Sequence, residues 1–281
     1  MKHNQRIKIS VWILIILSML SIGYALAGNN MVSQIKQFRV DNYYTPIITN
    51  LTSVPATDPH AGNITTIFIN FTVTDTDGVT ELNDSTARVV FNKSTATRNG
   101  TCLPNDFNTT STRYTCNVSM WYYDDPGVWS INVSVSDNTS RTAFNATTSF
   151  TYNSLSSISL NISQLSFGTV YLRTPTGAIN DPIIINNTGN TDFTNISLRA
   201  YDLVGVTNSA YIIYANQFGV GSTDMFNNTL QNNTFIPISG TSLTHGASAT
   251  EEVYIWVNIT YDIPAQDYNS NIHGAWMIMV E

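Results

Sequence analysis

Residues 129–136 read Trp-Ser-Ile-Asn-Val-Ser-Val-Ser, an unbroken alternation of apolar and polar side chains. Successive side chains of a β-strand point to opposite faces of the sheet, so this stretch predicts a strand with one buried and one exposed face. Residues 67–74 and 253–260 repeat the pattern, and no segment beyond residue 27 has a convincing helical period. The sequence therefore predicts an all-β protein.

Working outward from this strand, turn residues divide residues 42–152 at intervals typical of a β-sandwich. We predict six strands in this first domain, at 46–52, 65–74, 87–92, 112–121, 128–136 and 143–152. Asp125-Pro126-Gly127-Val128-Trp129 resembles the Asp-x-Gly-x-aromatic corner of immunoglobulin-like domains, with Trp129 in the usual place of a tyrosine. Together with Thr74-Asp75-Thr76-Asp77-Gly78-Val79, it resembles the Ig-like modules repeated in prokaryotic cell-surface proteins, which implies an Ig-like sandwich.

The second domain, residues 153–281, also predicts a β-sandwich. Residues 165–170, 183–190 and 193–200 resemble the CARDB-like adhesion-type module, in which a strand ends in Asn-Thr-Gly-Asn, here residues 187–190, before a hairpin. This resemblance covers less than half of the domain. We place further strands at 210–216, 235–239, 251–261 and 275–280, and a long loop at 217–234. The expected architecture is two tandem immunoglobulin-like β-sandwiches that follow an N-terminal signal or anchor helix and a linker, residues 28–41.

Asparagine residues head seventeen Asn-x-Ser/Thr triplets, where composition alone predicts roughly seven. The triplet is the acceptor of N-linked sugar in exported chains, so this density predicts a glycan-coated surface protein. Seven of the asparagines fall on the polar side of predicted strands, which is where an attached glycan has to be. The seventeen predicted sites are Asn50, Asn63, Asn70, Asn83, Asn92, Asn99, Asn108, Asn117, Asn132, Asn138, Asn145, Asn161, Asn186, Asn195, Asn227, Asn232 and Asn258.

The N-terminus carries an export signal. Lys2, Arg6 and Lys8 precede an apolar run, and Ala25-Leu26-Ala27 fits the small-x-small cleavage pattern. We favour cleavage after Ala27 by the Sec route; the alternative is an uncleaved membrane anchor over residues 9–27. In either case the basic flank stays inside, which places everything after Ala27 outside the cell.

Charge excludes one class of partner. Only nine of the twelve basic residues lie beyond Ala27, against all 19 acidic residues, so the exported part has a net charge of −10. Nucleic acid is therefore excluded as a partner. Cys102 and Cys116 are the only cysteines, and an extracellular setting favours a disulfide between them over two free thiols.

Motifs for catalysis are absent from the sequence. His60, His245 and His273 lie far apart, and the carboxylate pairs Asp124-Asp125 and Glu251-Glu252 fit a turn and the solvated start of a strand. We expect no enzyme and no cofactor, although a glycosidase could hold its two carboxylates on distant strands.

One group of carboxylates suggests a metal. Loops at the same end of an Ig-like sandwich would bring Asp75, Asp77 and Asp84 near Asp137, and such a cluster could hold extracellular calcium. A solvated Asp-x-Asp-Gly turn explains the same residues and is the interpretation we favour, because the EF-hand spacing is not completed by a glutamate.

Two classes of function remain. The first is a non-catalytic structural or adhesive surface glycoprotein, of archaeal type, that contacts other surface proteins or copies of itself. The second is a subunit of an extracellular filament in which residues 28–41, where Phe38 and Val40 alternate with charged residues, add a strand to the next subunit. An extracellular enzyme with an unrecognised site is a third and weaker hypothesis.

Overall fold

The computed structural model of this chain describes residues 43–223 and 228–281. The predicted signal or anchor (1–27), the linker and donor segment (28–41) and Asn227 lie outside the described residues. Within the described part, regular structure consists of strands and two short 3-10 helices, η1 (Val79–Glu81) and η2 (Ala215–Gln217). The predicted all-β fold class is confirmed.

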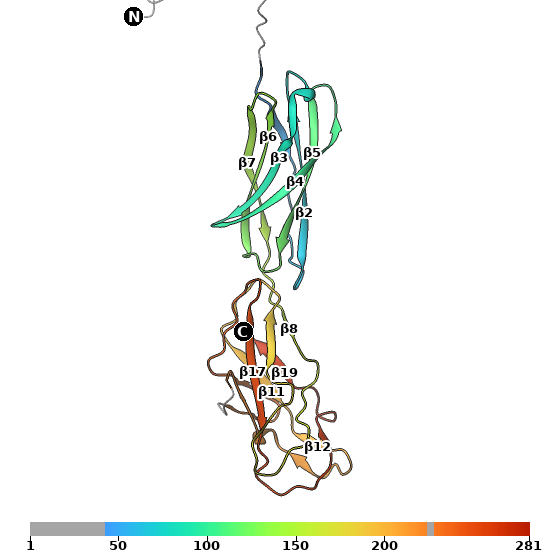
Figure 1. Cartoon of the computed structure of the whole chain (residues 1–281), viewed down its shortest axis with the longest axis vertical. Coiled ribbons are helices and arrows are strands. Elements are labelled where there is room, and N and C mark those ends of the chain that lie inside the picture. Colours follow the sequence, from blue (N-terminus) through green and yellow to red (C-terminus); the bar gives the residue numbers. More distant parts are fainter. Residues whose placement is uncertain (1–42, 224–227) are drawn as a thin grey trace, which may run out of the picture. The chain divides into compact units, whose positions relative to one another are not determined.

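The first sandwich contains seven antiparallel strands, and neighbours in sequence are often neighbours in the sheet (Figure 1). Their order is β1-β2-β5-β4-β3-β6-β7. The strands are β1 (Ile47–Leu51), β2 (Ile64–Thr74), β3 (Leu82–Lys93), β4 (Ala96–Phe107), β5 (Ser111–Trp121), β6 (Gly127–Asp137) and β7 (Thr142–Tyr152).

Strand β4 is the one that joins the two layers of this sandwich. Its first part pairs with β3, through Thr101↔Arg88, and its later part pairs with β5, from Gly100↔Val118 onward. Beyond Arg88 and Thr101 the two strands of the hairpin therefore separate. At the opposite side, Thr57 forms a parallel bridge with Tyr152 of β7, so the chain after β1 closes the sandwich there.

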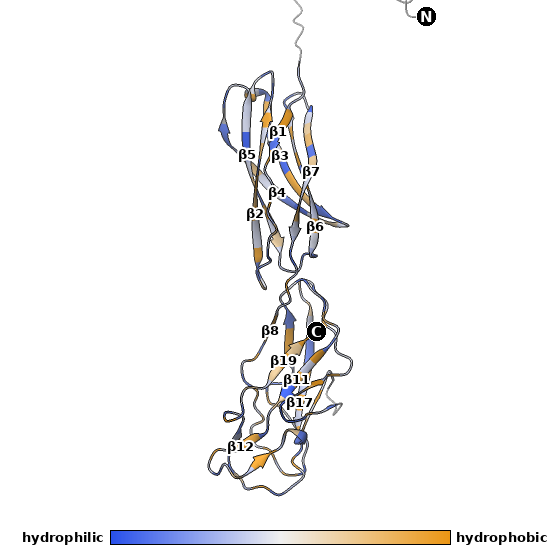
Figure 2. Ribbon diagram, turned by 180° about the vertical axis from the view of Figure 1, so that it is seen from behind, coloured by the Kyte–Doolittle hydropathy of each residue, from blue (hydrophilic) through white to orange (hydrophobic). Residues whose placement is uncertain are grey.

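The alternation seen in the sequence is the alternation of burial. In β6, Trp129, Ile131, Val133 and Val135 are at most 1% exposed and form the core with residues of the facing layer. Colouring by hydropathy shows apolar and polar residues alternating along these strands (Figure 2). Hydrophobic burial therefore fixes which face of each strand points outward.

The six predicted strands of this domain are present, with ends that differ by a few residues, but β4 was not predicted. Gly100 and Pro104 lower its strand propensity, and a register shift between Pro104 and Asp106 breaks its alternation. Pairing within the sheet overrides these local preferences, because β4 pairs with β3 over residues 96–101 and with β5 over residues 100–107.

The structure contains the disulfide between Cys102 and Cys116, with an S–S distance of 2.03 Å. The two residues are directly opposite each other in the β4–β5 register, and both are buried in the first core. The bond closes a short loop that contains the β4–β5 turn.

Removing this disulfide is expected to destabilise the first sandwich. Closing a loop of about 15 residues stabilises a fold by about 3 kcal/mol in the chain-entropy model. The double variant Cys102→Ala/Cys116→Ala should therefore melt well below the oxidised wild type, while reduction of the wild type by dithiothreitol should shift its melting in the same direction. Equal melting temperatures for the oxidised, reduced and double-variant proteins would contradict this role.

The second domain is built from shorter strands in three sheets. Their orders are β15-β14-β17-β10-β8 with β9 beside β17, then β16-β11-β19, and β13-β12-β18. The strands are β8 (Ile158–Leu160), β9 (Thr176–Gly177), β10 (Ile183–Asn187), β11 (Ile196–Ala200), β12 (Leu203–Gly205), β13 (Ile212–Ile213), β14 (Phe218–Gly221), β15 (Asn228–Thr229), β16 (Thr234–Pro237), β17 (Thr250–Val257), β18 (Tyr268–Asn269) and β19 (Met277–Val280).

Two predictions for this domain were wrong. The predicted strand 210–216 is limited to the two residues of β13 and is followed by η2, although Ile213 and Ala215 are buried. The predicted loop 217–234 contains β14, in which Phe218 and Val220 are buried, together with β15. Glycines at alternate positions of β14 hid its pattern, and they lie opposite large residues of β17, as in the pair Gly219↔Trp256.

Candidate modification sites and the polar junction

None of the sixteen described triplet asparagines is buried. The half-buried ones are Asn70, Asn83, Asn92, Asn132, Asn145, Asn186 and Asn258. The fully exposed ones are Asn50, Asn63, Asn99, Asn108, Asn117, Asn138, Asn161, Asn195 and Asn232. Asn227 lies outside the described residues. The acceptors are therefore found only on the surface of the described structure.

Each of the seven strands of the first sandwich carries an acceptor triplet, and in β2, β5 and β6 the residues on either side of the asparagine are buried in the core. Asn70, for example, lies between Ile69 and Phe71, which are at most 1% exposed. In β7 the flanking residues are not buried, because Phe144 beside Asn145 is 64% exposed. Both outer faces of this sandwich thus carry acceptors. One representative on each strand, from β1 to β7, is Asn50, Asn70, Asn92, Asn99, Asn117, Asn132 and Asn145.

Hydrogen bonds hold several of these amides by their oxygen. Asn70 Oδ1 accepts from Thr115 Oγ1 at 2.6 Å, and Asn117 Oδ1 accepts from Thr101 Oγ1 at 2.9 Å. In the triplet 145–147, the Oγ1 of Thr147 donates to Asn145 Oδ1 at 2.8 Å. Sugar is attached at Nδ2, so a hydrogen bond to Oδ1 orients the amide without occupying the attachment atom.

Asn258 differs from the other acceptors. Its Oδ1 is buried and has no hydrogen-bond partner in the described structure, and its backbone N–H donates to the Gln217 carbonyl at 2.8 Å. The oxygen end of this amide is therefore enclosed by protein.

The four carboxylates considered for calcium each hold a loop or a side chain instead. Asp137 Oδ1 accepts from the N–H groups of Thr139 and Arg141, both at 2.8 Å. Asp84 accepts from Tyr114 Oη at 2.6 Å. Across residues 43–223 and 228–281, no group of three or more His, Cys, Asp or Glu side chains is placed to hold a metal.

Asp75 is the most unusual member of this set. It is 1% exposed; its Oδ1 accepts from the Asp77 N–H at 3.0 Å, and its Oδ2 has no partner in the described structure. Burial raises the pKa of Asp75, and the nearby charges of Asp77 and Asp137 raise it further.

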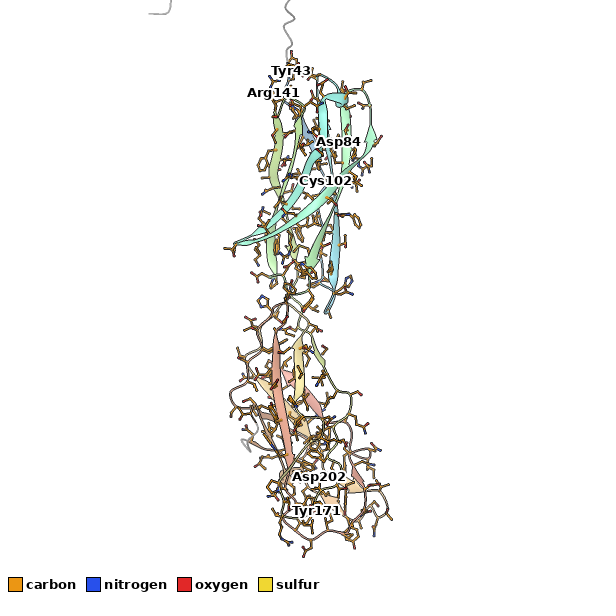
Figure 3. All side chains as sticks on the ribbon, viewed as in Figure 1. Tyr43, Asp84, Cys102, Arg141, Tyr171 and Asp202 are labelled. Atoms are coloured by element: carbon orange, nitrogen blue, oxygen red, sulfur yellow. A yellow bond between two sulfur atoms is a disulfide. The ribbon has the colours of Figure 1, made fainter. Side chains whose placement is uncertain are left out.

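Asp77 also accepts from the Tyr44 N–H at 2.5 Å, and Arg141 lies over the Tyr43 ring, 5.4 Å from its centroid (Figure 3). These carboxylates thus order the loops around the point where the described chain begins.

Asp124 lies in the turn that the sequence predicted before Pro126, and its side chain is buried there. It is 4% exposed, pairs with the guanidinium of Arg98, and accepts the Trp121 N–H at 2.8 Å. The Nε of Arg98 donates to Asp124 Oδ2 at 2.9 Å, and a second guanidinium nitrogen contacts Oδ1. The pair is missed in the sequence because its members are 26 positions apart.

A polar cluster follows the corner at Asp124-Asp125. The buried Asn190, the last residue of the Asn-Thr-Gly-Asn motif, donates through Nδ2 to the carbonyls of Asp124 and Asn153, both at 3.0 Å. Its Oδ1 accepts the Leu155 N–H at 2.6 Å. The motif therefore binds both the turn at Asp124 and the segment 153–155, where the second domain begins. The sequence did not indicate this role.

His245 takes part in the same cluster. Its Nδ1 lies 2.7 Å from Asp192 Oδ1 and its Nε2 lies 2.9 Å from Asp125 Oδ1. Burial acts to lower the pKa of His245, but the hydrogen bonds and charges of Asp125 and Asp192 outweigh it and hold the pKa above its ordinary value. The two carboxylates thus favour the imidazolium form, and the group has a structural explanation without catalysis.

A groove of about 650 Å³ lies where β3 and β4 separate. Asp84, Ala87 and Arg88 line one side, and Leu103 and Pro104 line the other. The Asp84 carboxylate, the acidic group here, is held by Tyr114. The groove opens at the side of the sandwich. Pro104 has no backbone N–H, so the β4 side of the groove has one hydrogen-bond donor fewer.

Comparison with known proteins adds little. No protein-family model matches the chain, and no curated protein matches it. Among solved structures, the complex of CsuC with the tip adhesion subunit CsuE from the archaic chaperone-usher pili of Acinetobacter baumannii is similar with 8% identity and a TM-score of 0.42, covering 84% of this chain and 99% of that one. A chaperone–tip adhesin complex of CFA/I fimbriae is similar with 10% identity and a TM-score of 0.35, covering 84% of this chain and 83% of that one. We base no inference on likenesses of this strength.

Fold and surface together define a class. The chain is an all-β protein of Ig-like β-sandwich type, and none of the Asn-x-Ser/Thr asparagines in its described residues is buried. Among the described residues no helix has the length and apolar character needed to cross a membrane.

Proposed function

We propose that this chain is a non-catalytic, N-glycosylated structural or adhesive protein of the cell surface. The observation that carries the proposal is the placement of the acceptor asparagines, none of which is buried in the described structure and at least one of which lies on each strand of the first sandwich. Solvent exposure of an acceptor is required for attachment of sugar.

Export supports the same proposal. A basic flank, an apolar run and the Ala25-Leu26-Ala27 site are features of a Sec signal, and the disulfide is of a kind that persists outside the cytoplasm. The charge of the exported part, with few lysines and arginines, leaves hydroxyls, amides and sugars to solvate the surface. Partners of such a protein are other surface proteins or further copies of the chain, and the source organism is proposed to be an archaeon.

Mapping of glycopeptides from protein isolated from its own cells tests this function. We expect sugar on most exposed acceptors, including Asn50, Asn99 and Asn117, and the lowest occupancy at Asn258, whose amide oxygen is buried. Asn105 and Asn216 serve as controls because they are exposed but head no triplet. Unmodified peptides at all of the exposed acceptors would overturn the proposal.

A further inference from the structure

The edge strands of the first sandwich are irregular and carry acceptor triplets. An edge strand leaves N–H and C=O groups unpaired, and native proteins protect such edges with bulges, prolines or charges. β1 has a register shift between Ile48 and Asn50, and Asn50 heads a triplet. β7 has a register shift opposite the segment between Ile131 and Val133 of β6, next to the acceptor Asn145. These edges are poorly suited to pairing with another chain.

The same protection recurs in the second domain. β16 ends in Pro237 and follows the acceptor Asn232. β8 spans three residues and is followed at once by the acceptor Asn161. Proline and an attached glycan would both disfavour strand addition at these edges.

β19 lacks all of these features. Residues 277–280 read Met-Ile-Met-Val, without proline, charge, register shift or acceptor asparagine. β19 lies at the edge of its three-stranded sheet, beside β11, which is its strand partner in the described structure (Figure 1). It is therefore an unprotected apolar edge.

The direction of its free backbone groups follows from the register. Glu281 and Asn195 exchange both backbone hydrogen bonds, Glu281 N–H to Asn195 at 3.0 Å and Asn195 N–H to Glu281 at 3.1 Å. Since such pairs alternate along an antiparallel ladder, Met279 and Met277 also direct their groups to β11. The N–H and C=O groups of Ile278 and Val280 then point away from β11, toward the open edge.

The core of the second domain, which includes the buried Ile183, Phe218 and Val253, is incompletely covered beside this edge. Fifteen hydrophobic residues pack against it while staying partly exposed, compared with four at the first core. Trp276, Ile278 and Val280 are among the fifteen. A neighbouring strand at this edge would remove apolar surface from water.

We propose that β19 pairs antiparallel with β19 of a second copy of this chain, about a two-fold axis through Met279. Residues directly opposite one another share a face, so Met279 faces Met279 of the second copy and Ile278 faces its Val280. The outward groups of Ile278 and Val280 are then satisfied by those of the other copy. Such an isologous interface needs no second kind of surface.

Charge supports a second copy as the occupant. In this register Met277 is opposite Glu281 of the second copy, and Met277 is also the cross-strand neighbour of Arg199. The Arg199 guanidinium contacts the Met277 sulfur, and its buried Nε has no hydrogen-bond partner in the described structure. Glu281 of the second copy would thus come close to Arg199, and symmetry repeats this contact.

Introduction of a charged residue at the two-fold axis tests the pairing. We expect the purified full chain to dimerise in analytical ultracentrifugation, and Met279→Lys and Met279→Glu each to weaken dimerisation by at least about tenfold, because like charges would be directly opposite. An equimolar mixture of the two variants should form dimers again. Val206→Lys, at an apolar residue 59% exposed elsewhere, is the control and should dimerise like the wild type.

A monomeric wild type, or dimers that persist in both Met279 variants, would overturn the proposal. Ile278→Pro gives a second check, because this N–H points away from β11 and its loss should reduce dimerisation while near-UV circular dichroism stays that of a folded protein. Regular fibres that disappear when residues 28–41 are deleted would assign the edge to that segment instead. Each outcome is independent of the glycopeptide map.

Discussion

Replacement of Trp129 by alanine is expected to lower the free energy of unfolding of the first sandwich by about 3–5 kcal/mol. Trp129 is fully buried in the first core, and its Nε1–H donates to the Asp125 carbonyl at 3.0 Å. The substitution therefore leaves a cavity and an unpaired carbonyl beside the corner that leads into β6. For a domain the size of residues 43–152, such a loss of stability lowers the melting temperature by more than about 10 °C.

Calorimetry of the full chain measures this effect. The neighbour Val128 is 63% exposed on the opposite face of β6, so Val128→Ala is a matched control that should change stability by no more than about 0.5 kcal/mol. Trp129→Phe should fall between the two. A melting temperature for Trp129→Ala equal to that of Val128→Ala would show that the core is not organised around this indole.

Replacement of Asp124 by alanine is expected to cost a similar amount, about 3–5 kcal/mol, because it leaves the Arg98 guanidinium partly buried without its partner. The carboxylate is 2% exposed at the side chain and the guanidinium 25%. Asp124 also accepts the Trp121 N–H, so the substitution removes an anchor of the turn that precedes Trp129. Urea denaturation followed by tryptophan fluorescence measures the loss.

Two controls separate the buried charge from the turn. The double variant Arg98→Met/Asp124→Leu should lose less stability than Asp124→Ala, because it leaves no uncompensated charge. Asp262→Ala removes an exposed ion pair, in which the side chain of Arg173 is 60% exposed and that of Asp262 is 83% exposed. This substitution should change stability by at most about 1 kcal/mol. If Asp124→Ala behaves like Asp262→Ala, the buried pair does not support the corner.

Where burial alternates along a strand, the sequence was sufficient to predict the structure. The runs around Ile69 and Val133 gave strands with the correct inward faces, and the acceptors between them are on the outside for the same reason. Two strands with glycine in their interior were not predicted, β4 at Gly100 and β14 at Gly219, because partners in the sheet and not local preference determine them.

Contacts between distant positions could not be predicted. Three such contacts depend on how turns from separate parts of the chain meet. They are the Arg98–Asp124 pair, the hydrogen bond from Asn190 to Asp124, and the position of His245 between Asp125 and Asp192. The carboxylates of Asp84 and Asp137 share a domain but are held by different partners, Tyr114 and the 139–141 turn. Sequence spacing carries no information on such partners, whereas exposure of a strand face follows from its period.

The intact mass of the protein isolated from its own cells tests the central proposal most directly. We expect a mass above that of residues 28–281, resolved into several glycoforms, which collapses to the mass of residues 28–281 after chemical deglycosylation. The distribution would then report cleavage after Ala27 and modification of the acceptors in one measurement. A single species at the 31.0 kDa of the unmodified 281-residue chain would contradict both export processing and glycosylation.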